Sequence, residues 1–272
     1  MNFEDVKNEI KNLGQYKTLA QIKAAGLCIT QNDAGDYWLI EKKFLKPAVK
    51  SPRECNNILV DQIKLKYKLL LCSKTKEELE NTATLQYISW GEKEAFDQRA
   101  STKGRNRWWD LGKRKPAGLN FNYLINDVGD TYVGSVFVSD NFHEIHTEKH
   151  LEVFLNSTVF WLFQNLSGRT SFGGGLLKIQ TYELERIFVL EVENKFDFPV
   201  LKRAPKSVFK ECGINPESTI LIEEQEPNPL PDRAELDKVV FDALELTEDE
   251  RKDVYRAVCS LVWNRISKAQ SV

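Results

Sequence analysis

The segment that most constrains the fold is the apolar run at residues 151–166, LEVFLNSTVFWLFQNL. Drawn as a helix, it carries apolar side chains almost all round, whereas a surface helix keeps them on one stripe. His150 and Glu148 border its start, and Ser167-Gly168 ends it. A helix that is apolar on every side has to be covered by other elements, so we predict a central buried helix.

Strand-like runs occupy much of the remaining chain up to residue 192. Residues 26–44 read as two strands, GLCIT and YWLI, joined by a QNDAGD turn, and residues 126–130 suit a hairpin connection. Further strands are predicted at residues 67–72, 86–90, 121–126, 131–139, 176–181 and 187–192, and short helices at residues 2–13 and 74–80. The expected class is α+β, with mixed, largely antiparallel sheets around the central helix.

The C-terminal part differs from the rest in composition. Residues 223–231, EEQEPNPLP, hold three prolines in their last five positions and predict a linker. A helix is expected at residues 232–244, and a second begins at the capping box formed by Thr247 and Glu250. The expected domains are therefore a 1–222 α+β domain, a 223–231 proline-rich linker and a 232–272 C-terminal helical pair.

Several protein classes find no support in this chain. The first 25 residues are charged throughout and contain no apolar core of a secretory signal, and no run approaches the ~20 uncharged apolar residues of a membrane span. Five cysteines are scattered without a Cys-x-x-Cys pair, which favours reduced thiols in a cytoplasm over a disulfide framework.

Charge is segregated along the chain although the net charge is only −2. Between Arg99 and Lys115 seven cations face the single anion Asp110, whereas residues 215–253 hold thirteen carboxylates against four cations. Salt screens distant charges over about 8–10 Å. The local patch therefore predicts a polyanion partner more strongly than the net charge argues against one.

Two adjacent tryptophans lie inside this basic patch, in the stretch RNRWWDLGKRKP at residues 105–116. Arginine and lysine bind phosphate, and tryptophan can stack on bases, so a nucleic-acid surface is one interpretation. In the other, one tryptophan fills the core, its neighbour lies under arginine stems, and the basic loop is merely solvated. The residues alone leave both open.

The glycine-rich loop GRTSFGGG, residues 168–175, raises a similar choice. It follows a helix and lacks the Lys-Ser or Lys-Thr pair of phosphate-binding loops, which argues against a nucleotide site. A loop that touches DNA through Arg169 and a plain connector both remain open. His143, His146 and His150 are close in sequence but match no standard zinc spacing, so no metal is expected.

Catalytic motifs are not found. The chain has no Gly-x-Ser-x-Gly and no His-Glu-x-x-His, and no two prolines are adjacent, which excludes an Asp/Asn-Pro-Pro-Tyr motif from these residues. Asp232 with Glu250-Arg251-Lys252 imitates a nuclease signature, but Glu250 is better explained by the capping box. We therefore expect no catalytic centre in this chain.

Two groups of motifs together resemble a known family. The first runs from YISWGE (87–92) through Arg99 to RWWDL (107–111); the second comprises LNST (155–158), Gly168-Arg169, GGGL (173–176) and YEL (182–184). From about residue 29 to 192 the chain resembles the C-terminal target-recognition region of adenine-specific DNA methyltransferases, of the Taq class and the fused type IIG restriction–modification enzymes. FDALELTEDERKDVYRAV resembles the helical tail that such proteins often carry.

The resemblance implies a division of labour. In that family an amino-terminal catalytic domain binds S-adenosylmethionine, flips the target adenine and methylates it, while the C-terminal domain reads the sequence. This chain lacks the catalytic half, so the resemblance implies a sequence-specific duplex DNA-binding module of a prokaryotic, cytoplasmic restriction–modification system, either a fragment or a stand-alone protein. Its partners would be duplex DNA and a catalytic methyltransferase domain or subunit, and S-adenosylmethionine would bind only there.

The resemblance also implies roles for individual residues. The expected DNA-binding set is Arg99, Lys103, Arg105, Arg107, Trp108, Trp109, Lys113, Arg114, Lys115, Arg169, Ser171 and Phe172. Its cations other than Arg99 and Arg107 would contact phosphates, while Arg107, Ser171 and Phe172 are candidates for base contacts. One tryptophan would anchor the loop to the core and the other would lie near DNA. Two alternatives remain: a subunit of a split methyltransferase or restriction enzyme, and a protein–protein module that docks through the acidic helical pair.

Overall fold

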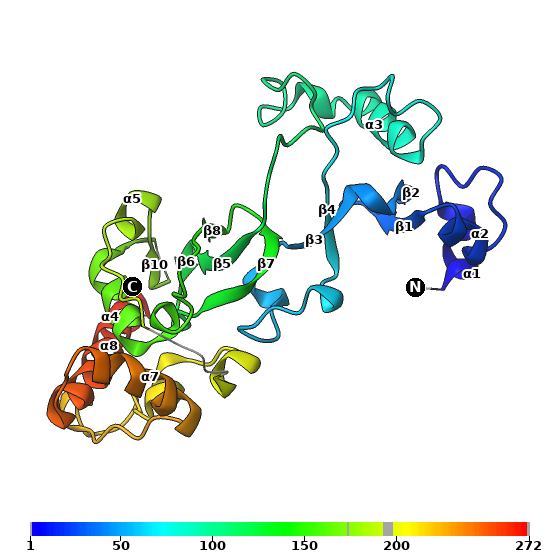
Figure 1. Ribbon diagram of the computed structural model, residues 1–272. Coiled ribbons are helices and arrows are strands. Elements are labelled where there is room, and N and C mark those ends of the chain that lie inside the picture. The colour runs from blue at the N-terminus through cyan, green and yellow to red at the C-terminus, as the bar shows by residue number, and fades with distance from the viewer. Residues whose placement is uncertain (1, 173, 193–197, 271–272) are drawn as a thin grey trace. The chain divides into compact units, whose positions relative to one another are not determined.

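The computed structural model describes residues 2–172, 174–192 and 198–270 (Figure 1). The chain forms two compact units, each built from two stretches of sequence. Unit 1 comprises Met1–Pro47 and Tyr67–Lys115, and unit 2 comprises Ala48–Lys66 and Pro116–Val272. This division differs from the expected ranges 1–222, 223–231 and 232–272, because the C-terminal helices share one core with the second half of the predicted α+β domain.

Unit 1 is built from a hairpin and short helices. Its hairpin pairs β1 with β2 in antiparallel register from Leu27↔Glu41 to Gln31↔Tyr37, which confirms the two strands predicted at residues 26–44. β4 is a neighbour of β3 in the sheet order, and the last two residues of β3 belong to unit 2. The elements are α1 (Phe3–Val6), η1 (Lys7–Glu9), α2 (Leu19–Ala24), β1 (Leu27–Gln31), β2 (Tyr37–Glu41), η2 (Lys42–Phe44), β3 (Leu45–Val49), β4 (Tyr67–Leu70), α3 (Ala83–Lys93) and η5 (Phe96–Gln98).

The strand predicted at residues 86–90 is wrong, because this segment lies inside the helix α3. Thr82 caps the helix by accepting a hydrogen bond from the Leu85 amide at 3.1 Å. The Glu41 carboxylate accepts from the amides of Ala83 and Thr84, both at 2.8 Å. A carboxylate at a helix N-terminus is favoured by the helix dipole. Glu41 is 42 residues away in sequence, so local propensity could not reveal this cap.

Three further predictions need correction. Residues 187–192 form no strand in the described structure; Phe188 is 86% exposed and Val189 51%, so this apolar run is not buried in a sheet. Residues 74–80 form turns instead of a helix, and the helix expected at residues 2–13 is a single turn of α1 followed by η1.

Unit 2 holds two small sheets. Strands β7, β5 and β8 pair antiparallel, and Ala48 and Val49 of β3 pair in parallel with β7. A second antiparallel sheet has the order β6-β10-β9. The elements are η3 (Pro52–Glu54), η4 (Gln62–Lys64), β5 (Ala117–Asn122), β6 (Leu124–Ile125), β7 (Thr131–Val138), β8 (Phe142–Ile145), η6 (Phe154–Asn156), α4 (Thr158–Ser167), β9 (Arg169–Phe172), β10 (Leu176–Lys178), α5 (Thr181–Leu184), η7 (Pro199–Lys202), α6 (Val208–Cys212), η8 (Ile222–Glu224), α7 (Pro231–Ala243) and α8 (Glu248–Gln270).

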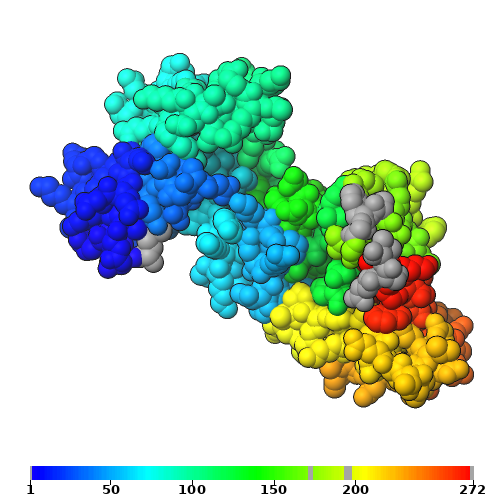
Figure 2. All heavy atoms as spheres, turned by 180° about the vertical axis from the view of Figure 1, so that it is seen from behind, coloured from blue at the N-terminus to red at the C-terminus, as the bar shows by residue number. Residues whose placement is uncertain are grey.

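The predicted central helix is confirmed as α4, which begins at Thr158, after the 3₁₀ turn η6. Ser157 caps it by accepting from the Phe160 amide at 3.2 Å. Phe160 and Trp161 are almost fully buried, and α4 packs against both α7 and α8. Figure 2 shows the yellow, orange and red parts of the chain, which include these two C-terminal helices, as one continuous mass within unit 2. The predicted α+β class with a C-terminal helical pair is therefore confirmed.

The capping box predicted for the second C-terminal helix is present. The Thr247 amide donates to a Glu250 carboxylate oxygen at 2.7 Å, and the Glu250 amide donates to the Thr247 hydroxyl at 3.4 Å. The segment expected to be a linker is anchored at both ends. The Gln225 side chain donates to the carbonyl groups of Asn215 and Ile220 at 2.8 and 2.9 Å, and the Leu230 amide donates to the Glu211 carbonyl at 3.0 Å.

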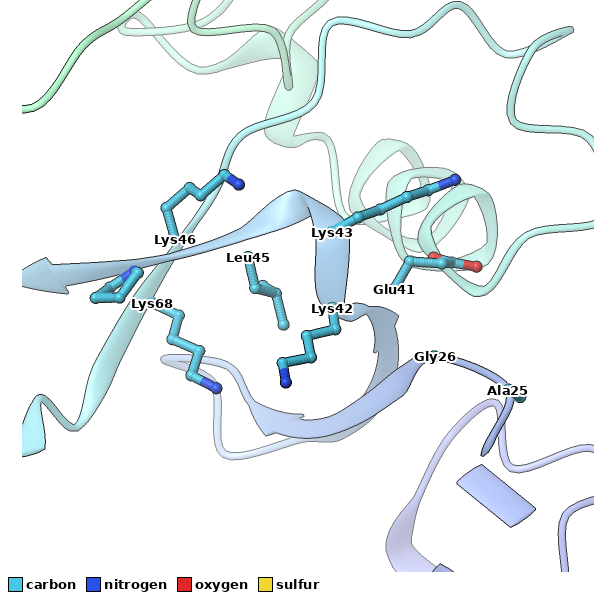
Figure 3. A pocket seen from close by; sticks show the side chains of 9 residues that line it. Ala25, Gly26, Glu41, Lys42, Lys43, Leu45, Lys46 and Lys68 are labelled. Atoms are coloured by element: carbon cyan, nitrogen blue, oxygen red, sulfur yellow. The ribbon is translucent and has the colours of Figure 1, made fainter. Parts of the chain in front are cut away.

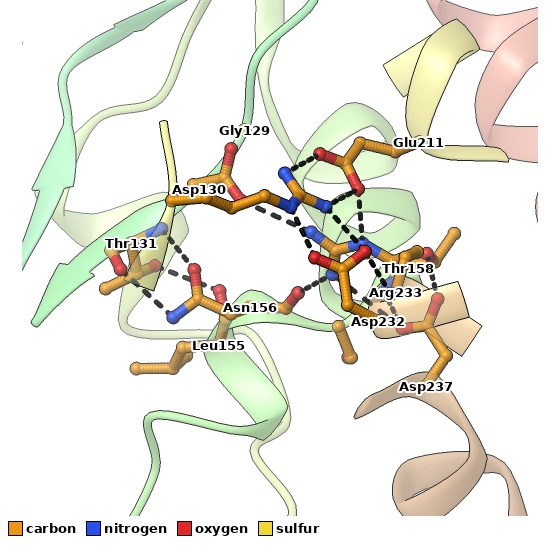
Figure 4. Close-up of polar contacts among 12 residues, drawn as sticks. Gly129, Asp130, Thr131, Leu155, Asn156, Thr158, Glu211, Asp232, Arg233 and Asp237 are labelled. Carbon is orange, nitrogen blue, oxygen red and sulfur yellow. Dashed lines mark hydrogen bonds and ion pairs between the residues drawn. The ribbon is translucent and has the colours of Figure 1, made fainter. Parts of the chain in front are cut away.

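A buried ion network fixes α7 to the rest of unit 2 (Figure 4). The Arg233 side chain is fully buried; its Nε donates to Glu211 at 3.1 Å and its Nη2 lies 3.4 Å from Asp130. The same guanidinium stacks 4.1 Å from the ring centroid of Trp161. Burial raises the pKa of Asp130 to about 7, and the Arg233 charge opposes that rise.

A second carboxylate of α7 caps the central helix. Asp237 is fully buried and accepts hydrogen bonds from the Thr158 amide at 2.8 Å and the Thr158 hydroxyl at 2.6 Å. Since these bonds occupy the first turn of α4, removal of α7 would leave buried donors unpaired at the centre of unit 2. The C-terminal helices are therefore part of the core.

Candidate nucleic-acid interface

The two motifs of the first group meet in unit 1, where their aromatic rings form a continuous series that we call the aromatic array. Neighbouring ring centroids along the array lie 5.2–6.2 Å apart. Tyr87 and Trp90 are three residues apart in α3, so they lie on one face and stack at 5.4 Å. The array consists of Trp38, Tyr87, Trp90, Phe96, Trp108 and Trp109.

The two adjacent tryptophans have different surroundings. Trp109 is 7% exposed, packs in a core cluster with Leu79 and Ile88, and donates from Nε1 to the Lys74 carbonyl at 3.3 Å. Trp108 is half-buried and lies on Gly91 of α3. A Cβ added at Gly91 would come within 2.5 Å of the Trp108 ring. Gly91 is therefore required for the close approach of helix and loop.

The contact between the two motifs was not predicted. It had a weak signal in the sequence, because Tyr87, Trp90 and Gly91 share a helical spacing of three to four residues. In the strand predicted at residues 86–90, neighbouring side chains would alternate between opposite faces, so Tyr87, Trp90 and Gly91 would not share one face.

Around the aromatic array runs the basic segment, residues 99–115. Among its predicted site residues other than Arg99, five cations are exposed and make no ion pair within the described part of the chain. The Arg105 guanidinium donates to the Trp108 carbonyl at 3.4 Å, which orients it beside the array. The five are Lys103, Arg105, Lys113, Arg114 and Lys115.

The one anion of the basic segment is already occupied. Asp110 accepts from Nε of Arg107 at 3.2 Å and from the Gly112 amide at 2.8 Å. These hydrogen bonds lower the pKa of Asp110, Arg107 contributing first. Arg99 has a different contact, with its guanidinium 3.7 Å from the Phe96 ring centroid. Asp110 therefore neutralises Arg107 and leaves the five exposed cations unopposed at close range.

The other predicted site residues belong to unit 2. Arg169 pairs with Glu183 and lies 5.3 Å from the Tyr182 ring centroid. The backbone of Ser171 and Phe172 lies in β9, but their side chains fall outside the described part of the structure. The structure thus gathers the predicted residues 99–115 in one unit and leaves Arg169, Ser171 and Phe172 in the other.

The close approach made by the glycine-rich loop is to a helix of the same chain. Gly175 has φ +68°, and a Cβ there would come within 2.9 Å of Cα of Ile266 in α8. A guanidinium nitrogen of Arg265 donates to the Gly175 carbonyl. The glycine at this position therefore allows the loop to pack closely against α8.

Charge divides between the units more sharply than along the sequence. Unit 1 has 18 Lys and Arg against 13 Asp and Glu, a formal charge of +5, and unit 2 has 20 against 27, a charge of −7. The net charge of −2 therefore conceals one cationic and one anionic body.

The three histidines form no metal site in the described part of the chain. Within the described residues, no group of three His, Cys, Asp or Glu side chains lies close enough to hold a metal ion. His143 is used in packing: its Nε2 is 2.8 Å from the Ile179 carbonyl oxygen. The described helices include none that is both long and apolar enough to cross a bilayer.

Comparison with known proteins gives consistent results. A family profile described as type II methyltransferase M.Eco57I, C-terminal domain, matches residues 38–212. The type II methyltransferase M.XamI of Xanthomonas campestris pv. amaranthicola is 28% identical over 132 residues, covering 44% of this chain and 23% of that protein. The type IIG restriction endonuclease BpuSI superposes with a TM-score of 0.53 at 13% identity, covering 85% of this chain and 27% of that one, a likeness of fold alone. The matches thus span about a quarter of each relative.

Proposed function

The chain belongs to the family of C-terminal domains represented by the type II methyltransferase M.Eco57I, and on that premise we propose that it is the duplex DNA target-recognition module of a restriction–modification methyltransferase. The observation that carries the proposal is the basic segment of unit 1, whose five exposed cations are held on a packed aromatic array. Phosphate contacts of this kind give affinity and register without reading sequence.

The anchoring of the basic segment supports this role. A recognition module has to hold the duplex rigidly, since misplacement of the reacting base by about 1 Å is costly to catalysis. Trp109 in the core and Trp108 on Gly91 fix the backbone from which the cations project. We assign Lys103, Arg105, Lys113, Arg114 and Lys115 to phosphate contacts and Trp108 to the DNA side of the array.

The geometry assigns Arg107 a positioning role. Its guanidinium is bonded to Asp110, which in turn accepts from the Gly112 amide, so the pair closes the turn between the tryptophans and Lys113. Base contacts by Ser171 and Phe172 remain part of the proposal, as does a phosphate contact by Arg169 if it exchanges Glu183 for DNA.

We further propose that methyl transfer is carried out by a domain or subunit outside these residues, in a prokaryotic cytoplasm. The relatives are about four times longer than the matched region and are methyltransferases or restriction enzymes by name. S-adenosylmethionine would bind in that catalytic part.

The acidic helical pair is a weaker candidate for a protein-docking module. Both helices contribute to the core of unit 2, including Phe241 of α7 and Val258 and Val262 of α8. Deletion of residues 231–272 would remove this core as well as the acidic face, so loss of a partner in that variant would not identify a docking surface.

Duplex binding by the 272-residue chain tests the proposal. Fluorescence anisotropy with labelled duplexes should show binding at about 50 mM salt that weakens steeply as salt rises. K113A/R114A/K115A should flatten the slope of log K against log salt by about three, roughly one per lost phosphate contact. The control K64A/K149A/K238A removes three exposed lysines of unit 2 and should leave the slope unchanged.

Sequence preference needs its own measurement. Selection from a random duplex pool should enrich a common site, bound at least ~10³-fold more tightly than unrelated DNA. No binding of any duplex at low salt would remove the proposal, and equal binding of all sequences would remove target recognition while leaving a non-specific DNA-binding module.

A further inference from the structure

A second cationic site lies in unit 1, at an open hollow of about 670 Å³ (Figure 3). Its walls come from the end of β2, the 3₁₀ turn η2, the start of β3 and one residue of β4. None of its lining residues belongs to the basic segment. The lining residues are Ala25, Gly26, Glu41, Lys42, Lys43, Leu45, Lys46, Pro47 and Lys68.

Four of these nine residues are lysines, and none of the four makes an ion pair within the described structure. Lys42, Lys43 and Lys68 are exposed and Lys46 is half-buried. Lys43 lies 5.0 Å from the Phe44 ring centroid, a contact that leaves its charge unneutralised. In Figure 3 the ammonium groups of Lys42 and Lys68 point to the same side of the hollow, on either side of Leu45. Unpaired ammonium groups that line one hollow raise its positive potential, which favours binding of an anion.

The single acid of the lining is committed elsewhere. The Glu41 carboxylate accepts the Ala83 and Thr84 amides at 2.8 Å each and the Thr84 hydroxyl at 2.5 Å. These bonds satisfy the first turn of α3, so the carboxylate faces the positive end of that helix. The hollow therefore keeps the positive field of its lysines.

The composition of the walls decides which anion fits. Lysines act as mobile point charges that suit phosphate oxygens, while Leu45 and Pro47 give an apolar floor without a donor or acceptor side chain. No aromatic side chain lines the hollow, whereas a site for a nucleobase or an adenosyl group normally offers a stacking surface or hydrogen-bonding groups. The chemistry therefore favours a phosphodiester over a nucleoside.

We propose that this hollow binds a backbone phosphate of the DNA, held between Lys42 and Lys68, with Lys43 and Lys46 strengthening the local field. The site rests on the proposed function, since the phosphate belongs to the duplex that the basic segment also contacts. It extends the DNA-contacting surface of unit 1 to residues on η2, β3 and β4.

Salt-dependent binding by paired variants tests the proposal. K42A/K68A should reduce the slope of log K against log salt by about two, the value for two lost lysine–phosphate contacts. The matched control K17A/K23A removes two exposed lysines of the same unit that lie outside the hollow, and should leave the slope within about half a unit of the wild type. Circular dichroism of each variant checks that unit 1 is folded.

Lysine footprinting gives an independent measurement on the unaltered chain. With duplex DNA bound, acetylation of Lys42 and Lys68 should fall several-fold relative to that of Lys17 and Lys23, and inorganic phosphate at millimolar concentration should not reproduce this protection. Protection by free phosphate as strong as that by duplex would overturn the assignment to backbone DNA.

The two proposals fail in different ways. If the wild type binds duplex but K42A/K68A matches K17A/K23A in slope and Lys42 and Lys68 stay reactive, the hollow is not a phosphate site although the module binds DNA. If the wild type binds no duplex, the proposed function falls, and the phosphate site falls with it.

Discussion

Arg105 of unit 1 lies on the surface, whereas Arg233 of unit 2 lies in the core. In unit 1, Arg105 is exposed beside the aromatic array and makes no ion pair in the described structure. In unit 2, Arg233 is fully buried between Glu211 and Asp130, with its guanidinium against Trp161. Unit 1 thus leaves the Arg105 guanidinium without an ion pair at the surface, whereas unit 2 uses the Arg233 guanidinium to hold its core together.

The comparison shows that overall charge is a poor guide to where a charged ligand binds. The cationic unit has an uncharged interior of aromatic and aliphatic side chains, and the anionic unit places four carboxylates around two guanidiniums: Glu211, Asp130, Asp232 and Asp237 around Arg203 and Arg233. Breaking a buried network leaves unpaired charges, whereas losing an exposed cation costs the fold little.

The largest effect is expected from Arg233→Met. It leaves Asp130 and Asp237 buried without their cation and Glu211 with Arg203 alone, which should lower the opening free energy of unit 2 by about 3–5 kcal/mol. Hydrogen exchange read by mass spectrometry should show the loss in α7 and at the start of α4, with unit 1 unchanged. Arg186→Met, at an exposed arginine of unit 2, is the control. A loss below about 1 kcal/mol would show that the network contributes little.

A smaller effect is expected in unit 1 from Gly91→Ala. The new methyl group would lie within about 2.6 Å of two carbon atoms of Trp108, so the ring has to move. We expect destabilisation of about 1–3 kcal/mol from overpacking, partly offset by the better helix propensity of alanine. Near-ultraviolet circular dichroism should record the displaced ring, and duplex affinity should fall.

Gly104→Ala is the control for that change, because a Cβ at Gly104 meets nothing within 4 Å. Equal spectra for wild type, Gly91→Ala and Gly104→Ala would contradict the packing of Trp108 on α3.

The smallest effect is expected from Asp130→Asn near pH 4. Burial raises the pKa of Asp130 from 3.8 to about 7. Between these two pH values the Asp130 carboxyl therefore stays protonated in the folded state and is ionised in the unfolded chain. The stabilisation is complete below pH 3.8 and is lost as the pH rises towards 7. Asparagine mimics the protonated carboxyl and does not titrate. The two proteins should therefore differ by less than about 1 kcal/mol near pH 4, and the wild type should lose stability relative to the variant as the pH rises from there to 7.

Denaturant unfolding of both proteins at several pH values measures this difference in the free energy of unfolding. Both proteins share all other titrating groups, so the contributions of those groups cancel in the difference. A difference that stays constant from pH 5 to pH 8 would show that Asp130 does not titrate in this range.

Much of the fold could be predicted from local patterns. The β1–β2 hairpin follows from its turn residues, α4 from an apolar run too wide for a surface helix, and α8 from the Thr247–Glu250 capping box. Each of these signals lies within the element that it specifies. The basic segment was equally visible, because its cations lie close together in sequence.

The remaining features depend on contacts between distant residues. α3 is capped by Glu41 from another element, so the segment 86–90 was mistaken for a strand. The hollow is lined by both Lys42 and Lys68, although the residues between them in sequence include 48–66, which belong to the other unit. From the sequence alone Arg233 is expected on the surface, because its partners Glu211 and Asp130 are distant in sequence.

The order in which the units occur along the chain has a consequence for synthesis. Unit 1 is complete once residue 115 has been made, but residues 48–66 belong to unit 2 and need strands that follow residue 116 and a core closed by α8. At roughly 5–20 residues per second this delay is on the order of ten seconds. Until then the apolar side chains of Val49, Ile58 and Val60, which are buried in the finished protein, have no core to enter. The nascent chain is therefore most prone to aggregate after its cationic unit has already folded.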